Sequence, residues 1–241
     1  MNINKNKNVS LNLREPVSPQ VYSILRDQII QGDVAPGTRF SEAEISREFK
    51  TSRQPVREAF IKLRNEGLVE VRPQRGTYVT KIWIDAVRDA RFIREAIETD
   101  IVKLLVSDGN PQMAAVLRQQ IELQKNLEPS ERERFIELDE EFHRTLAVCA
   151  HKAIAWKVIA SMKAHLDRVR HLSSPQKPIK ILIDQHEEIV DAIENKDTVK
   201  AEKAIRHHMQ EVLRDLPKIV AKNPELFRKN GVTKNPVNGA I

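Results

Sequence analysis

Four residues that can bind a metal ion stand at helical spacing in the second half of the chain. Asp139 and His143 are four residues apart, so on a helix their side chains point the same way. His186 and His208 each lie among apolar residues that recur every three or four positions, so they too are expected to face a bundle interior. Burying one carboxylate and three imidazoles is costly unless these groups satisfy one another or bind an ion. Three nitrogens and one oxygen suit Zn²⁺, Ni²⁺ or a similar divalent ion, with positions left for water or a ligand.

A second group of residues has the pattern of a DNA-reading helix. Ser52 opens a predicted helix with Arg53 at its tip, and Gln54 and Arg57 project from the side opposite its apolar stripe. Arginine can grip guanine through O6 and N7, and glutamine can pair in the same way with adenine. The free backbone N–H groups at the start of the helix favour a phosphate. This arrangement suits a recognition helix that presents its first turn to the major groove.

A basic hairpin tip follows this helix. Arg72 and Arg75 flank the predicted turn, where they could reach the DNA backbone or the minor groove, and Gly76 permits the tight reversal. Between Arg47 and Arg75, eight Lys/Arg face four Asp/Glu, so this stretch holds +4 of the +6 net charge. Each arginine taken singly is better explained as a solvated surface charge. The set together predicts DNA binding.

The elements that must position these residues follow from glycine placement and apolar periodicity. Glycines punctuate the first eighty residues and are then almost absent until Gly231, which indicates packed helices. We expect a mainly α protein with a winged helix-turn-helix at 13–82, made of three helices and two β segments. An all-α antiparallel bundle of six helices should span 83–222. These helices are expected near 85–107, 111–127, 131–149, 152–173, 178–195 and 197–222. Residues 1–12 are expected to form a mobile arm and 223–241 a flexible tail.

Composition limits the cellular setting. The sequence is 40% hydrophobic and 31% charged, with no apolar run long enough to cross a bilayer and no secretory apolar core at its start. Cys149 is the single cysteine and cannot form an internal disulfide, which agrees with a reducing compartment. We therefore expect a cytoplasmic protein that does not contact membranes, with Cys149 as a small core residue.

The DNA-reading region resembles the GntR family of bacterial regulators. The likeness lies in the runs PGTRFSE, SRQPVREAF, EGLV and RG between Ile30 and Val79. The following region resembles the FCD effector domain of the FadR subfamily, and the wording SRQPVREAFIKL, RPQRG and ELDEEFH is most similar to RspR-type repressors. The resemblance implies that Arg53 and Arg57 are the principal DNA-contacting arginines. Members can carry a further arginine where this sequence reads Glu42-Ala43-Glu44, so that contact is either absent or supplied by Arg39 or Arg47.

The resemblance also implies roles in the second domain. Metal-binding FCD domains use an Asp-x-x-x-His pair and two later histidines, and the four candidate ligands fall on those positions. His151, His165, His171 and His207 do not, and we expect them at the surface or between helices. Small carboxylates bind beside the metal in such domains with help from an arginine of the first bundle helix, which Arg94 matches; Arg168 and Arg170 are weaker candidates. Members often have Gly-Asn where His151-Lys152 stands here, which is a departure from the family pattern between the third and fourth bundle helices.

These features lead to one hypothesis and three alternatives. We expect a homodimer that binds a pseudo-palindromic double-stranded operator and is released by a small, sugar-acid-like carboxylate bound near the metal. The alternatives are a regulator that senses the metal directly, a metal-dependent hydrolase, and a metal that only stabilises the fold. Taken singly, each histidine is better explained as a hydrogen-bonded core residue, so the metal hypothesis rests on all four together.

Overall fold

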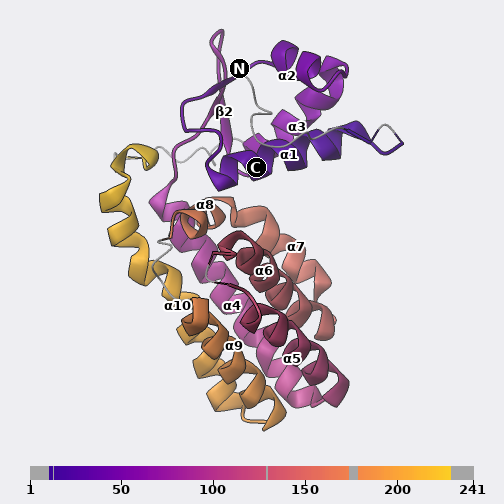
Figure 1. Cartoon of the computed structure of the whole chain (residues 1–241), viewed down its shortest axis with the longest axis vertical. Coiled ribbons are helices and arrows are strands. Elements are labelled where there is room, and N and C mark those ends of the chain that lie inside the picture. The colour runs from indigo at the N-terminus through magenta and orange to yellow at the C-terminus, as the bar shows by residue number, and fades with distance from the viewer. Residues whose placement is uncertain (1–10, 13, 129, 174–178, 229–241) are drawn as a thin grey trace, which may run out of the picture.

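The protein consists of a small winged domain at one end of a long helical bundle, as the computed structural model shows (Figure 1). The structure describes residues 11–12, 14–128, 130–173 and 179–228. Most of the predicted N-terminal arm and residues 229–241 of the predicted tail lie outside these ranges. Within them, the fold is mainly α, with a single small sheet. The predicted fold class is confirmed.

The winged domain contains three helices and a three-stranded sheet. In chain order its elements are α1 (Val17–Gln31), β1 (Arg39–Phe40), α2 (Glu42–Glu48), α3 (Arg53–Asn65), β2 (Val69–Arg72) and β3 (Gly76–Val79). The sheet is antiparallel with the order β1-β3-β2. The short strand β1 was not predicted, because two residues carry no period. Ser41 and Glu44 have the sequence spacing of a capping box at the start of α2, but the Ser41 side chain caps no backbone N–H.

The bundle contains seven helices where the sequence predicts six. They are α4 (Ile84–Asp108), α5 (Pro111–Lys125), α6 (Arg132–Cys149), α7 (Ala153–Met162), α8 (Ala164–Leu172), α9 (Ile179–Glu194) and α10 (Thr198–Lys222). The helix expected at 152–173 is wrong, since it breaks at Lys163 into α7 and α8. The Lys163 ammonium is buried between Glu140, at 2.9 Å, and Asp167, at 2.7 Å. Because the chain changes direction here, α8 can pack against α1 of the winged domain.

The start of the predicted tail packs against the domain junction. A 3₁₀ turn, η1 (Pro224–Leu226), precedes Phe227, which is buried and forms a parallel bridge with Ile82. Phe227 and Ile82 join residues of α4, α8 and α10 in a small core of their own, separate from the main bundle core. Residues 223–228, which were expected to belong to a flexible tail, are instead ordered against the domain junction.

Within the described residues, no helix is both long enough and apolar enough to cross a membrane. Cys149 is partly buried at the end of α6 and packs against the bundle core, as the sequence predicts.

A buried histidine lies at the junction between the two domains. His165 on α8 stacks on Trp83, with ring centroids 5.8 Å apart, and its Nδ1 accepts a hydrogen bond from the Trp83 backbone N–H at 3.4 Å. Burial, aided by the nearby Arg168, lowers the pKa of His165 to about 3. The folded protein therefore keeps His165 neutral at pH values at which an unfolded histidine becomes protonated.

This junction should make stability depend on pH. As the pH falls from about 6.5 toward 3, His165 becomes protonated in the unfolded chain but stays neutral in the folded protein. The free energy of unfolding therefore decreases in that window, by up to about 1.4 kcal/mol per pH unit. We expect the free energy of unfolding, measured by urea titration, to decrease less between pH 7 and pH 5 for His165→Gln than for the wild type. His151→Asn, at an exposed histidine, should lose as much as the wild type. Equal pH slopes for all three proteins would contradict the assignment.

Candidate metal centre and DNA-reading surface

The four predicted metal ligands meet at one point inside the bundle. Asp139 and His143 come from α6, His186 from α9 and His208 from α10, and none is more than 8% exposed. Their ligand atoms all lie within 4.8 Å of one another. The Nε2 atoms of His143 and His208 are 3.1 Å apart, and the Nε2 atom of His186 is 3.5 Å from Asp139 Oδ1. The structure thus brings together the set that helical spacing selected.

Three further side chains orient the histidines, and sequence reasoning missed all three. The Nδ1 atom of His143 is 2.6 Å from Glu98 Oε2, that of His186 is 2.8 Å from Gln124 Oε1, and that of His208 is 3.0 Å from Gln185 Oε1. Because each Nδ1 has a partner, each Nε2 is left to point inward. Metal-bound histidines are commonly held in this way.

The charges around the centre favour ionised carboxylates and neutral imidazoles. Burial opposes ionisation of Asp139, but Arg170, which donates a hydrogen bond to Oδ2, and the histidines hold the pKa of that carboxyl well below its usual range. Burial lowers the pKa of His186 to about 3 and also depresses the pKa of His208. A carboxylate and neutral imidazoles are the forms that bind a metal ion.

The donor set passes a simple test of fit to a divalent ion. The Nε2 atom of His186 is buried and has no hydrogen-bond partner. A buried nitrogen without a partner costs free energy unless an ion or water satisfies it. Ligands at about 2.0–2.2 Å from one ion lie a few ångströms apart, as these four do.

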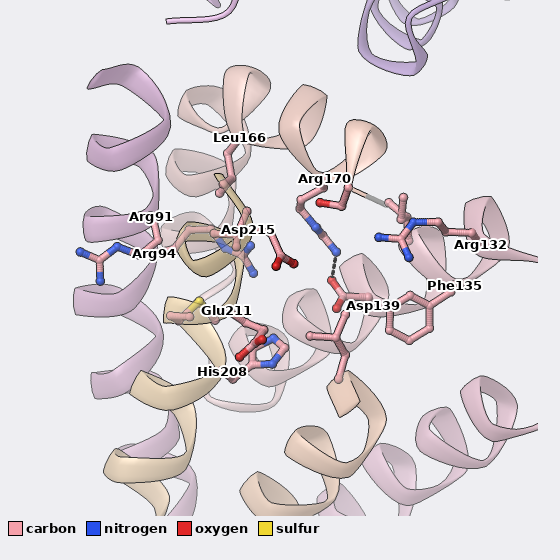
Figure 2. A pocket seen from close by; sticks show the side chains of 15 residues that line it. Arg91, Arg94, Arg132, Phe135, Asp139, Leu166, Arg170, His208, Glu211 and Asp215 are labelled. Carbon is pink, nitrogen blue, oxygen red and sulfur yellow. Dashed lines mark hydrogen bonds and ion pairs between the residues drawn. The ribbon is translucent and has the colours of Figure 1, made fainter. Parts of the chain in front are cut away.

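A cavity beside this centre is lined by arginines (Figure 2). It opens over Asp139 and His208, and Arg170 reaches down to Asp139 from α8. One nitrogen on each lining arginine is buried without a hydrogen-bond partner: Arg91 Nε, Arg94 Nη2, Arg132 Nε and Arg170 Nη1. The free space is small, about 70 Å³. The Arg91 guanidinium points away from the cavity and pairs with Glu95, so the unsatisfied donors beside the cavity are those of Arg94, Arg132 and Arg170, in a volume suited to a small anion (Figure 2).

The candidate effector arginines divide between two places. Arg94 lines the cavity, and its Nε donates to Glu98 at 2.8 Å, so the Glu98 carboxylate bridges Arg94 and His143. Arg168 is not among the lining residues, because its Nη1 donates to the backbone carbonyl of Thr80 at 2.9 Å, at the base of the winged domain. Arg170, the other candidate on α8, lines the cavity in its place. Arg91 and Arg132 were not singled out from the sequence.

The four remaining histidines stand away from the tetrad. His151 is exposed after α6, and His207 on α10 and His171 at the end of α8 are partly buried. His165 is buried between the domains. Adjacent His207 and His208 differ because successive residues on a helix point about 100° apart.

The DNA-reading candidates form an exposed surface on the winged domain. Ser52, Arg53, Gln54 and Arg57 are all exposed at the start of α3, and the predicted stripe of Val56, Ala59, Phe60 and Leu63 is buried. The Gln54 amide donates to Glu58 at 3.2 Å. The Arg57 guanidinium pairs with both carboxylate oxygens of Glu42, at 3.1 and 3.0 Å. The start of α3 is thus exposed to solvent, and the partners of Gln54 and Arg57 lie within the winged domain itself.

The hairpin tip carries the other candidates. Arg72 stacks on Tyr78, with the guanidinium carbon 4.4 Å from the ring centroid, and also pairs with Glu70 at 2.6 Å. Arg75 is exposed, and Gly76 has a φ of 110°, which glycine adopts without strain. Arg39 lies beside Gly76 on the neighbouring strand, and the Arg47 side chain bonds back to the Ala43 carbonyl. Of the two substitute arginines expected from the sequence, Arg39 therefore lies with the wing.

Comparison with known families matches both halves of the chain. Residues 18–79 match the family described as bacterial regulatory proteins, gntR family, and residues 89–211 match the FCD domain. Each match coincides with one of the structural domains. The family resemblance inferred from the sequence is therefore confirmed for both domains.

Individual proteins give the same result. The chain is 40% identical over 219 residues to the HTH-type transcriptional repressor RspR of Escherichia coli, covering 90% of this chain and 96% of that protein. It is 30% identical over 197 residues to a probable D-xylose utilization operon transcriptional repressor of Paenarthrobacter nicotinovorans, covering 81% of this chain and 87% of that protein. The solved structure of E. coli McbR/YncC has the same fold, with a TM-score of 0.70, 22% identity and coverage of 84% and 97% of the two chains.

Proposed function

Because the chain belongs to the GntR family of bacterial DNA-binding regulators and carries an FCD domain, we propose that it is a transcriptional repressor released by a small carboxylate. The carboxylate would bind beside a divalent metal in the bundle. The cavity of unsatisfied arginine N–H groups next to the Asp/His tetrad carries this proposal. Both matching families are regulators, so the hydrolase alternative is set aside. The names of the two relatives support repression.

The operator contacts we propose lie on the exposed face of the winged domain. Arg53, Gln54 and Arg57 would read base edges in the major groove from the first turn of α3. Ser52 lies where backbone N–H groups at the helix start would meet a phosphate. The wing would contribute Arg72, Arg75 and Gly76 to the backbone or the minor groove. Each of these side chains is exposed, apart from Gly76 at the turn, which is partly buried.

We propose that Asp139, His143, His186 and His208 hold the metal, with Zn²⁺ or Ni²⁺ as the best match to three imidazoles and one carboxylate. A bound divalent ion would supply positive charge that attracts and orients a carboxylate. The chain's own groups would do the rest. Arg94, Arg132 and Arg170, which line the cavity, would neutralise the ligand through charge-assisted hydrogen bonds. Glu98 would orient both His143 and Arg94, because each of its carboxylate oxygens contacts one of them.

The helix α8 offers a physical route from the cavity to the DNA-reading domain. Arg170 pairs with Asp139 inside the bundle, whereas Arg168 bonds to Thr80 and Asp167 pairs with Arg26 of α1 at 3.4 Å. Ala164 packs into the core of the winged domain. A ligand that takes hydrogen bonds from Arg170 would therefore act on a helix that packs against both α1 of the winged domain and α4 and α10 of the bundle. Coupling requires that the ligand bind the two domain arrangements unequally.

We propose that a second copy of the chain covers α7. Ile154, Val158 and Met162 lie four residues apart on this helix and are 77%, 45% and 46% exposed. Such a spacing places the three side chains in one apolar stripe, which a soluble protein tends to cover. A two-fold pairing of chains would also present two recognition helices to a pseudo-palindromic operator.

The metal assignment predicts a selective loss of binding. His208→Ala removes one of four ligands, so we expect Zn²⁺ affinity, measured by competition with a chromogenic chelator, to fall at least tenfold relative to the wild type. His207→Ala changes the adjacent residue on the same helix and should leave affinity unchanged. Equal affinities for His208→Ala and wild type would contradict the assignment.

The release mechanism can be tested on the zinc-loaded protein with duplexes selected from a random library. We expect acetate, citrate or D-gluconate to lower duplex affinity in fluorescence anisotropy. Arg132→Gln should weaken that response roughly tenfold, since a hydrogen bond to a charged group is lost, while Arg134→Gln, at an exposed arginine on the same helix, should not. If Zn²⁺ alone switches DNA binding and no carboxylate has an effect, the protein senses the metal directly.

The pairing proposal predicts a change of oligomeric state. Ile154→Asp would place a charge on the most exposed residue of the covered stripe, so we expect it to yield monomers in light scattering and to weaken duplex binding. Val199→Asp introduces the same charge at an apolar residue that is 81% exposed on α10, and it should remain dimeric. A dimeric Ile154→Asp variant would exclude α7 as the interface.

A further inference from the structure

The contact between Arg57 and Glu42 has a geometry that bears on DNA reading. The Nε of Arg57 donates to Oε1 of Glu42, and Nη2 donates to Oε2. A guanidinium has five N–H donors, so two are used and three remain. The three that remain lie at its far end, on Nη1 and on the outer side of Nη2. This end is the part of an arginine that can grip guanine O6 and N7 together.

The surrounding fold fixes both partners of this pair. Glu42 is the first residue of α2, and it follows Phe40 by two positions. The Phe40 ring stacks on Phe60 of α3, with centroids 5.7 Å apart, and both rings are buried. Phe60 lies one turn after Arg57 on α3. The aromatic contact therefore holds the start of α2 against the second turn of the recognition helix.

The pair lies at the surface, where simple attraction between charges contributes little stability. The Arg57 side chain is 58% exposed and the Glu42 side chain 31%, and exposed ion pairs are screened by water and contribute little to stability. By contrast, Arg53 makes no hydrogen bond or ion pair with the described residues. The contact restricts one arginine of the reading surface to a single orientation and leaves its neighbour free.

We propose that Glu42 is a specificity-determining positioning residue, which holds the side edge of the Arg57 guanidinium so that its far end meets a guanine of the operator. This inference rests on the proposed DNA-reading role of Arg57. A held arginine loses less side-chain freedom on binding, so the correct base gains affinity. The Glu42 carboxylate also repels phosphates, which lowers affinity for every duplex to a similar extent. The orientation of Arg57 is therefore the effect that widens the gap between specific and non-specific binding.

Glu42 and Glu44 provide a matched pair for the test. Both carboxylates lie in the first turn of α2, but Glu44 is exposed and has no ion pair with the described residues. Glu42→Gln and Glu44→Gln therefore remove the same charge from the same turn. Only the first removes the fork that holds Arg57, because an amide offers one acceptor oxygen and a donor that the guanidinium cannot bond.

The experiment selects binding sites from a randomised DNA duplex library with the full-length wild type, Glu42→Gln, Glu44→Gln, Arg57→Ala and the double variant Glu42→Gln/Arg57→Ala. Affinities are then measured for the wild-type consensus and for a duplex with the guanine replaced by adenine. We expect Arg57→Ala to lose the preference for one guanine, and Glu42→Gln to reduce preference at that same position roughly tenfold. Glu44→Gln should bind all duplexes more tightly but keep the wild-type preference. The double variant should match Arg57→Ala, because Glu42 acts through Arg57.

Three results would overturn the proposal. The first is a preference for Glu42→Gln equal to that of Glu44→Gln. The second is a Glu42→Gln protein that binds the consensus more tightly and with undiminished preference, which would make Glu42 a competitor of DNA for Arg57. The third is a further loss in the double variant beyond Arg57→Ala. If the wild type itself enriches no sequence, the proposed operator function fails instead. Thermal unfolding of each variant checks that the winged domain remains folded.

Discussion

The ion pair between Arg170 and Asp139 joins the parts of this molecule that must act together. It lies inside the bundle, where neither charge is tolerated without the other, since removing one partner of a buried pair leaves an uncompensated charge. Asp139 belongs to the Asp/His tetrad, and Arg170 lies on α8, which packs against the winged domain. The pair therefore ties α8, which begins after the break at Lys163 and also packs against α1, to the Asp/His tetrad.

The sequence indicated the tetrad because helix geometry alone aligns its members. The four-residue spacing of Asp139 and His143, and the apolar stripes around the two later histidines, do not depend on how the helices pack. The residues that hold the histidines in place carry no such signal. Glu98, Gln124 and Gln185 reach them from α4, α5 and α9, and only the tertiary arrangement sets which helix faces which. A glutamine on the apolar face of an amphipathic helix, as at Gln124 and Gln185, was the sequence signal that could have indicated such a partner.

The two arginines of α8 show the same limit at closer range. Arg168 and Arg170 are two residues apart, about 200° around a helix, so only one of them can face the cavity. A sequence window that is apolar on several sides does not say which side faces inward, so the sequence left both Arg168 and Arg170 as effector candidates. In the structure Arg170 lines the cavity, and Arg168 donates to the Thr80 carbonyl instead. The short strand β1 was missed for a similar reason, because its two residues are too few to show an alternation of apolar and polar side chains.

The metal centre and the DNA-reading surface share one physical device, a fixed carboxylate that restricts the orientation of a functional side chain. Glu98 holds His143 and Arg94, and Glu42 holds Arg57. The two carboxylates differ in setting, because Glu98 is buried and its pKa is lowered to about 2 by Arg94 and His143 despite burial, whereas Glu42 is partly exposed. Loss of either partner of the buried contact would leave an uncompensated charge inside the bundle. At the surface the contact contributes little to stability, so its effect is expected in the choice among ligands. A group oriented before its ligand arrives loses less freedom on binding. This applies to His143 and Arg94 in the bundle and to Arg57 in the winged domain.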